Sequence, residues 1–85
     1  MAFEVISDLR SEGHRDWVSS TVIGALGVEL DQGVWVLRLY ALERGDIRIT
    51  LGRSGGAVFE LRMAKPGKDR QRELGRALEG AIRTL

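Results

Sequence analysis

The segment from Val34 to Leu42 constrains the fold of this chain most, because it is apolar on both sides of a β-strand. One side holds Trp35, Leu37, Leu39 and Ala41, and the other holds Val34, Val36, Arg38, Tyr40 and Leu42. A strand with one side in water usually alternates apolar and polar residues. We therefore expect this strand to be covered on both of its faces.

Turn-forming residues on either side of this segment indicate further strands. Asp31–Gly33 is typical of a hairpin loop, Glu43–Asp46 of a tight turn and Arg53–Gly56 of another turn. The β-branched and aromatic run WVSSTVI favours a strand over residues 17–30, with a bend at Gly24 and Gly27. The same reasoning predicts strands over residues 47–51 and 57–63.

The two ends of the chain favour helices. After Pro66 and Gly67, an apolar stripe at helical spacing predicts an amphipathic helix over residues 68–84. Its members are Leu74, Ala77, Leu78, Ala81, Ile82 and Leu85. Residues 2–11 fit a short helix, which we favour, and also a short strand. The predicted fold is a single α+β domain (residues 1–85): a four-stranded antiparallel meander packed on a C-terminal amphipathic helix, with a short N-terminal helix or strand.

Residues with strong chemical reactivity are scarce. The chain of 85 residues has no cysteine, and its one histidine, His14, lies in the polar segment 11–16, which we expect to be a solvated loop. The twelve acidic residues are scattered, and the glycine-rich segment 52–56 matches no phosphate-binding motif. We therefore expect a protein that is not an enzyme and holds no metal or cofactor.

The opening residues also bear on where the protein works. Glu4 and Asp8 stand where a secretory signal needs an apolar core, and no apolar run is long enough to cross a membrane. We expect a cytoplasmic protein without a membrane partner.

A single C-terminal helix can cover only one face of the sheet, so the second face of the central strand needs another cover. The N-terminal segment could supply it, but a second copy of the chain fits better, because the apolar residues exceed what ten residues can bury. The expected dimer core is Val34, Val36, Tyr40 and Leu42. We therefore predict a small protein–protein interaction module, an adaptor, inhibitor or assembly subunit, that forms a homodimer through a sheet face.

Charge is distributed unevenly along the chain. Residues 1–46 contain four basic and eight acidic residues, whereas residues 47–85 contain nine basic and four acidic ones. Basic residues gather where the last helix should begin, which suits an anionic group. This pattern predicts that the protein binds an acidic partner surface through Arg53, Lys65, Lys68, Arg70 and Arg72.

The same distribution of basic residues also fits a second function, the binding of single-stranded nucleic acid. Single-stranded nucleic acid binds to sheets that combine outward arginines with an exposed aromatic ring. The residues that would serve this role are Arg38, Tyr40, Arg48 and Arg62. Trp17 and Trp35 are better explained as core residues.

Overall fold

The apolar segment that begins at Val34 forms an inner strand of a four-stranded sheet with the order β1-β2-β3-β4. The computed structural model describes residues 2–54 and 56–84. Its main elements are β1 (Ala2–Ser7), α1 (Glu12–Leu26), β2 (Val34–Ala41), β3 (Ile47–Arg53), β4 (Gly56–Met63) and α2 (Gln71–Arg83). Short 3-10 turns, η1 (Gly27–Asp31), η2 (Glu43–Gly45) and η3 (Lys68–Arg70), join some of them. The protein therefore belongs to the α+β class, with a mixed sheet and two helices.

The prediction of a strand over residues 17–30 is wrong, because most of that segment lies in helix α1. Ser11 caps this helix: its Oγ accepts a hydrogen bond of 3.2 Å from the backbone N–H of His14. The helix ends at Gly27, whose φ of 52° is left-handed. Between these signals, Trp17, Val18, Val22 and Leu26 are all buried on one side. Burial of this stripe outweighs the weak helix propensity of the β-branched residues.

The N-terminal segment is a strand, so the favoured helix over residues 2–11 is also wrong. Strand β1 pairs with β2 in parallel, with Phe3 beside Trp35 and Val5 beside Leu37. A parallel pair needs a crossover, which α1 provides. The sheet is therefore mixed and not an antiparallel meander, and Asp31–Gly33 belongs to a helix-to-strand connection instead of a hairpin. Gly33 does take a positive φ, of 139°.

The antiparallel part of the prediction is confirmed. Strands β2, β3 and β4 pair antiparallel, and the register shifts at Leu51 and Gly52 as in a β-bulge. The tight turn at Glu43–Asp46 is present, with the Asp46 N–H bonded to the Glu43 carbonyl at 3.3 Å. The turn between β3 and β4 includes residue 55, which lies outside the described residues, as does Leu85 of the predicted stripe. The C-terminal helix is confirmed as α2, which follows η3.

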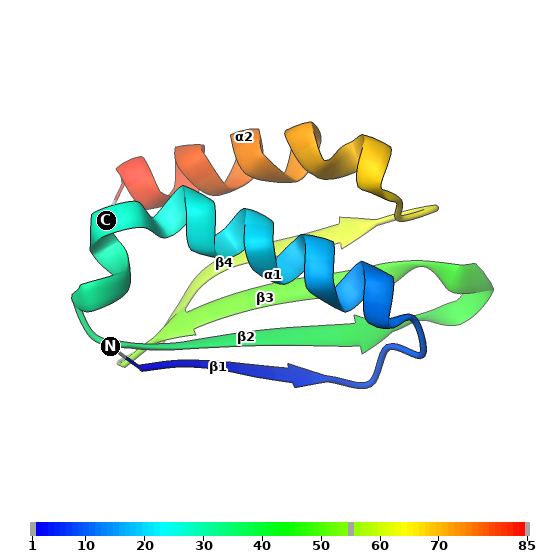
Figure 1. Cartoon of the computed structure of the whole chain (residues 1–85), viewed down its shortest axis with the longest axis horizontal. Coiled ribbons are helices and arrows are strands. Elements are labelled where there is room, and N and C mark those ends of the chain that lie inside the picture. The colour runs from blue at the N-terminus through cyan, green and yellow to red at the C-terminus, as the bar shows by residue number, and fades with distance from the viewer. Residues whose placement is uncertain (1, 55, 85) are drawn as a thin grey trace.

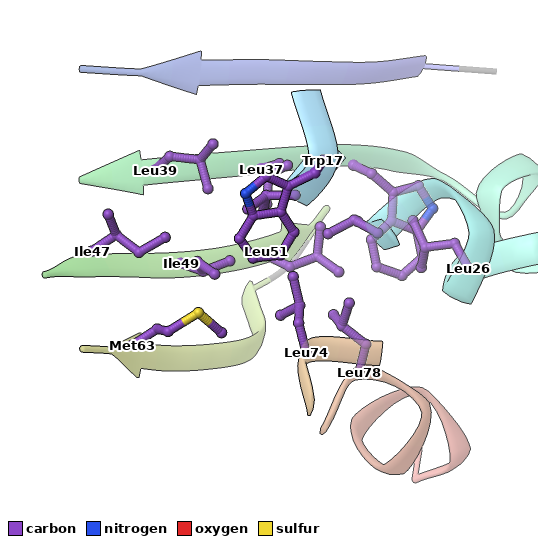
Figure 2. Close-up of a cluster of buried hydrophobic side chains, with 13 residues drawn as sticks. Trp17, Leu26, Leu37, Leu39, Ile47, Ile49, Leu51, Met63, Leu74 and Leu78 are labelled. Carbon is purple, nitrogen blue, oxygen red and sulfur yellow. The ribbon is translucent and has the colours of Figure 1, made fainter. Parts of the chain in front are cut away.

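Both helices pack on the same face of the sheet, so the molecule has two layers (Figure 1). The core between the layers consists of buried apolar side chains from both helices and from β2, β3 and β4 (Figure 2). Its members are Trp17, Val18, Val22, Leu26, Trp35, Leu37, Leu39, Ile47, Ile49, Leu51, Met63, Leu74 and Leu78. Trp17 and Trp35 are core residues, as predicted. No element within residues 2–54 and 56–84 covers the opposite face of the sheet.

Among the helices of the described ranges, none has both the length and the apolar character needed to cross a lipid bilayer.

Candidate functional site

The face of the sheet away from the helices is the candidate site, and we call it the open face. Side chains alternate along each strand, so the residues between the core positions point to this side. Strand β1 contributes Glu4 and Ile6, β2 contributes Val34, Val36, Arg38 and Tyr40, β3 contributes Arg48, Thr50 and Gly52, and β4 contributes Glu60 and Arg62. The strand register places them in rows across the sheet: Ile6, Arg38, Thr50 and Glu60 form one row, and Tyr40, Arg48 and Arg62 form the next.

One half of the open face is apolar and hollowed. The side chain of Val34 is 49% exposed and that of Ile6 is 45% exposed, while Val36 is half-buried. A hollow of about 350 Å³ lies beside Val34 and Val36, and its lining includes Gly52 and Ala57 as well as the polar residues Arg38 and Thr50. Because Gly52 has no side chain, it leaves a depression in the surface between the side chains of Val36 and Ala57. The result is a shallow depression, with apolar floor residues and a partly polar lining, on a solvent-facing sheet.

The other half carries charged groups that are bonded to one another. The Arg48 guanidinium lies 5.5 Å from the centre of the Tyr40 ring, within the range of a cation–π contact. Its Nε donates a hydrogen bond of 3.0 Å to Oε2 of Glu60. This hydrogen bond and the charge of Glu60 raise the pKa of Arg48 above its usual value. A longer ion pair of 3.9 Å joins Arg62 to Asp46. These contacts use much of the binding capacity of Tyr40 and Arg48.

The structure brings part of the predicted dimer core together. Val34, Val36 and Tyr40 share the open face, as do the four residues of the predicted nucleic-acid site. Leu42 does not belong to this group, because it follows the end of β2 and lines a separate hollow with Asp8 and Leu9.

Arg53 lies at the end of β3 and is half-buried. Its guanidinium lies 5.3 Å from the centre of the Trp35 ring, and its aliphatic stem lies close to Gly33. Trp35 itself points to the helical layer. Arg53 therefore packs against the core at one end of the sheet, although it also contributes to the lining of the hollow on the open face.

The predicted basic residues 65–72 lie in the connection from β4 to α2 and in the first turn of α2. Arg70 is held in place there: it bonds to the carbonyl of Ala64, and its Nε donates to Oε2 of Glu73 at 2.9 Å. Lys65, Lys68 and Arg72 are exposed. Of the five cations predicted to meet an acidic partner, these three leave their charged groups exposed, whereas Arg53 and Arg70 are half-buried and contact other residues of the chain.

Sequence reasoning missed the contributions of β1 and Gly52 to the open face. The helix that we favoured over residues 2–11 does not place Glu4 and Ile6 on a face of the sheet. The signal that could have corrected this is the β-branched and aromatic character of Phe3, Val5 and Ile6, which favours a strand.

Other parts of the surface offer fewer binding features. A hollow of about 620 Å³ between the first turns of the two helices is lined by His14, Ser20, Lys68 and Gln71, among others. Next to it, Trp17 is 7% exposed, and its indole N–H has no hydrogen-bond partner in the described part of the protein. Within the same residues, no group of three His, Cys, Asp or Glu side chains is arranged to hold a metal ion.

Comparisons with known proteins identify a similar fold and no family. No protein-family model matches the sequence, and no curated protein matches it either. The solved structure of the Protein Y N-terminal domain from Thermus thermophilus is similar, with a TM-score of 0.52 and 18% sequence identity. The similarity covers 100% of each chain. At this identity, the comparison shows a shared fold over the whole length of this chain.

Proposed function

We propose that this chain is a non-enzymatic protein-interaction module that self-associates through the open face of its sheet. The exposure of Val34 beside the hollow, and of Ile6 elsewhere on the same face, carries the proposal, because no described element covers these two residues. The N-terminal segment, which could have served as a cover, lies next to β2 within the sheet. A second copy of the face would remove these side chains from water.

The area of the open face limits the affinity that we expect for the dimer. Four strands at their usual spacing, six to eight residues long, span roughly 19 by 25 Å. That area, roughly 475 Å², is well below the roughly 800 Å² that each partner of a standard interface buries. We therefore expect a weak, reversible dimer with a dissociation constant on the order of 10–100 μM.

Binding of single-stranded nucleic acid remains an alternative prediction with less support from the geometry. Stacking of a base needs a free aromatic face, and the ring of Tyr40 already has Arg48 over it. Arg48 is paired with Glu60, and Arg62 with Asp46. A labelled oligonucleotide titrated at low salt tests this alternative, because phosphate binding is strongest under that condition.

The exposed cations Lys65, Lys68 and Arg72 suit a separate role. We propose that they orient an acidic partner towards the end of the molecule where α2 begins. Charges at such a position raise the association rate more than they add affinity.

Sedimentation equilibrium between about 5 and 500 μM tests self-association, since this range spans the expected dissociation constant. The wild-type mass should rise towards that of a dimer, and Val34→Lys should keep the protein monomeric across the range. Val28→Lys is the matched control, because Val28 is 81% exposed but lies in η1, outside the open face. A wild-type protein that stays monomeric at every concentration would defeat the proposal.

A further inference from the structure

Four side chains at the border of β1 and β2 form a two-by-two block on the open face. The parallel register pairs Glu4 with Val36 and Ile6 with Arg38. The two charged residues therefore lie on one diagonal of the block, and the two apolar residues lie on the other. We call these four residues the quartet.

The charges of the quartet form no ion pair with the described residues of their own chain. Among residues 2–54 and 56–84, no basic group lies within ion-pair distance of Glu4, and no carboxylate lies within that distance of Arg38. The other two arginines of the open face, Arg48 and Arg62, do have carboxylate partners. Glu4 and Arg38 are both exposed. They are the opposite charges of the face that are left for a partner.

Such a block is complementary to its own copy. A two-fold axis that lies in the interface along the apolar diagonal places Ile6 and Val36 against their own copies. The same rotation exchanges the ends of the charged diagonal, so that Glu4 of each copy meets Arg38 of the other. An isologous interface requires this kind of self-complementary pattern.

We infer that the open face forms a two-fold dimer in which Glu4 of each chain pairs with Arg38 of the second copy, around an apolar centre of Ile6 and Val36. This inference rests on the proposed self-association and adds the orientation of the two copies. The two reciprocal ion pairs select the register of the dimer, because other rotations bring like charges together or leave these charges unpaired.

Charge reversal tests the pairing, with sedimentation equilibrium as the measurement. Glu4→Arg places two arginines at each contact, and Arg38→Glu places two carboxylates there. Each variant alone should dimerise about 10- to 100-fold more weakly than wild type. An equimolar mixture of the two should recover the dimer, because a Glu4→Arg chain offers two cations to the two carboxylates of an Arg38→Glu chain.

Two controls separate this result from simpler causes. Glu79→Arg changes the same charge on the exposed side of α2, and it should leave the dimer unchanged. Thermal unfolding of each variant confirms that it is folded, and Glu4→Gln with Arg38→Gln replaces the reversals if either unfolds. The glutamine variants should each weaken the dimer by a smaller factor.

The possible results distinguish the orientation from self-association itself. If Glu4→Arg and Arg38→Glu each dimerise as tightly as wild type, the pairing of Glu4 with Arg38 is wrong. The proposed self-association would still stand. If the double variant Glu4→Arg/Arg38→Glu dimerised but the mixture of single variants did not, the two residues would pair within one chain, and the inference would be wrong. A monomeric wild-type protein would remove both proposals.

Discussion

The indole Nε1 of Trp35 donates a hydrogen bond of 2.9 Å to the carbonyl oxygen of Glu29. Trp35 is fully buried in β2, and Glu29 lies in the 3-10 turn that follows α1. This bond therefore ties the helix-to-strand connection to the sheet. Trp17, the other core tryptophan, has no such bond, because its Nε1 is without a partner in the described part of the chain.

The two tryptophans should respond differently to replacement by phenylalanine. Trp35→Phe removes packed volume and one of two hydrogen bonds to the Glu29 carbonyl, which keeps the bond of 2.9 Å from the Gln32 N–H. We therefore expect a loss of about 2 kcal/mol in the free energy of unfolding. Trp17→Phe removes an N–H that is already unsatisfied. Its loss in the free energy of unfolding should therefore be about 1 kcal/mol smaller than that of Trp35→Phe. Unfolding in urea measures both. Equal losses for the two variants would contradict the role of the hydrogen bond.

The turn between β2 and β3 predicts a stabilising substitution. Arg44 has φ 62° and ψ 22°, and Gly45 has φ 80°, which are the angles of a type I′ turn. Asparagine tolerates the first position of this turn much better than a long side chain does. We expect Arg44→Asn to raise the free energy of unfolding by about 0.5–1 kcal/mol. Arg44→Val should lower it, and a stabilising effect of valine would show that the turn has another conformation.

Asp8 joins the end of β1 to the end of β2. Its Oδ1 accepts a hydrogen bond of 2.6 Å from the backbone N–H of Ala41, next to the bond from the Asp8 N–H to the Leu39 carbonyl. Asp8→Ala removes the acceptor and should destabilise the protein by about 1 kcal/mol. Asp8→Asn keeps an acceptor oxygen and should change stability by less than half as much. Hydrogen exchange of the Ala41 amide should quicken in the alanine variant alone.

Gly52 offers a way to alter the open face without disturbing the core. A Cβ atom at this position would lie 3.6 Å from the Gly56 carbonyl oxygen, an ordinary contact. Gly52→Ala should therefore fold normally but raise the floor of the hollow, and we expect it to change the dimer dissociation constant severalfold. Gly80→Ala, on exposed α2, is the control: it should add about 1 kcal/mol of stability and leave dimerisation unaltered. Equal dimerisation of Gly52→Ala and wild type would place the contact elsewhere on the protein.

The β2–β4 region and α2 could be predicted from the sequence because their signals are local. Tight turns separate short apolar strands there, and the α2 stripe repeats at helical spacing. The secondary structure of residues 17–26 was harder to predict. The composition WVSSTVI favours a strand, whereas the burial of Trp17, Val18 and Val22 on one side requires a helix. Ser11 and Gly27 marked the ends of that helix and were the better signal.

The candidate site was predictable in part for the same reason. The alternation within β2 placed Val34, Val36, Arg38 and Tyr40 on one face. The neighbours that complete the quartet, Glu4 and Ile6, come from β1, more than 25 residues earlier in the chain. Parallel pairing over such a distance leaves no mark in local sequence patterns, because it depends on how α1 returns the chain.

Helices α1 and α2 run in the same direction over the sheet (Figure 1). Their peptide dipoles consequently add instead of cancelling, and the molecule acquires an electrical polarity along its strands. The positive pole is the end where both helices begin. A negatively charged body that diffuses towards the protein would be turned to meet that end before any atoms touch.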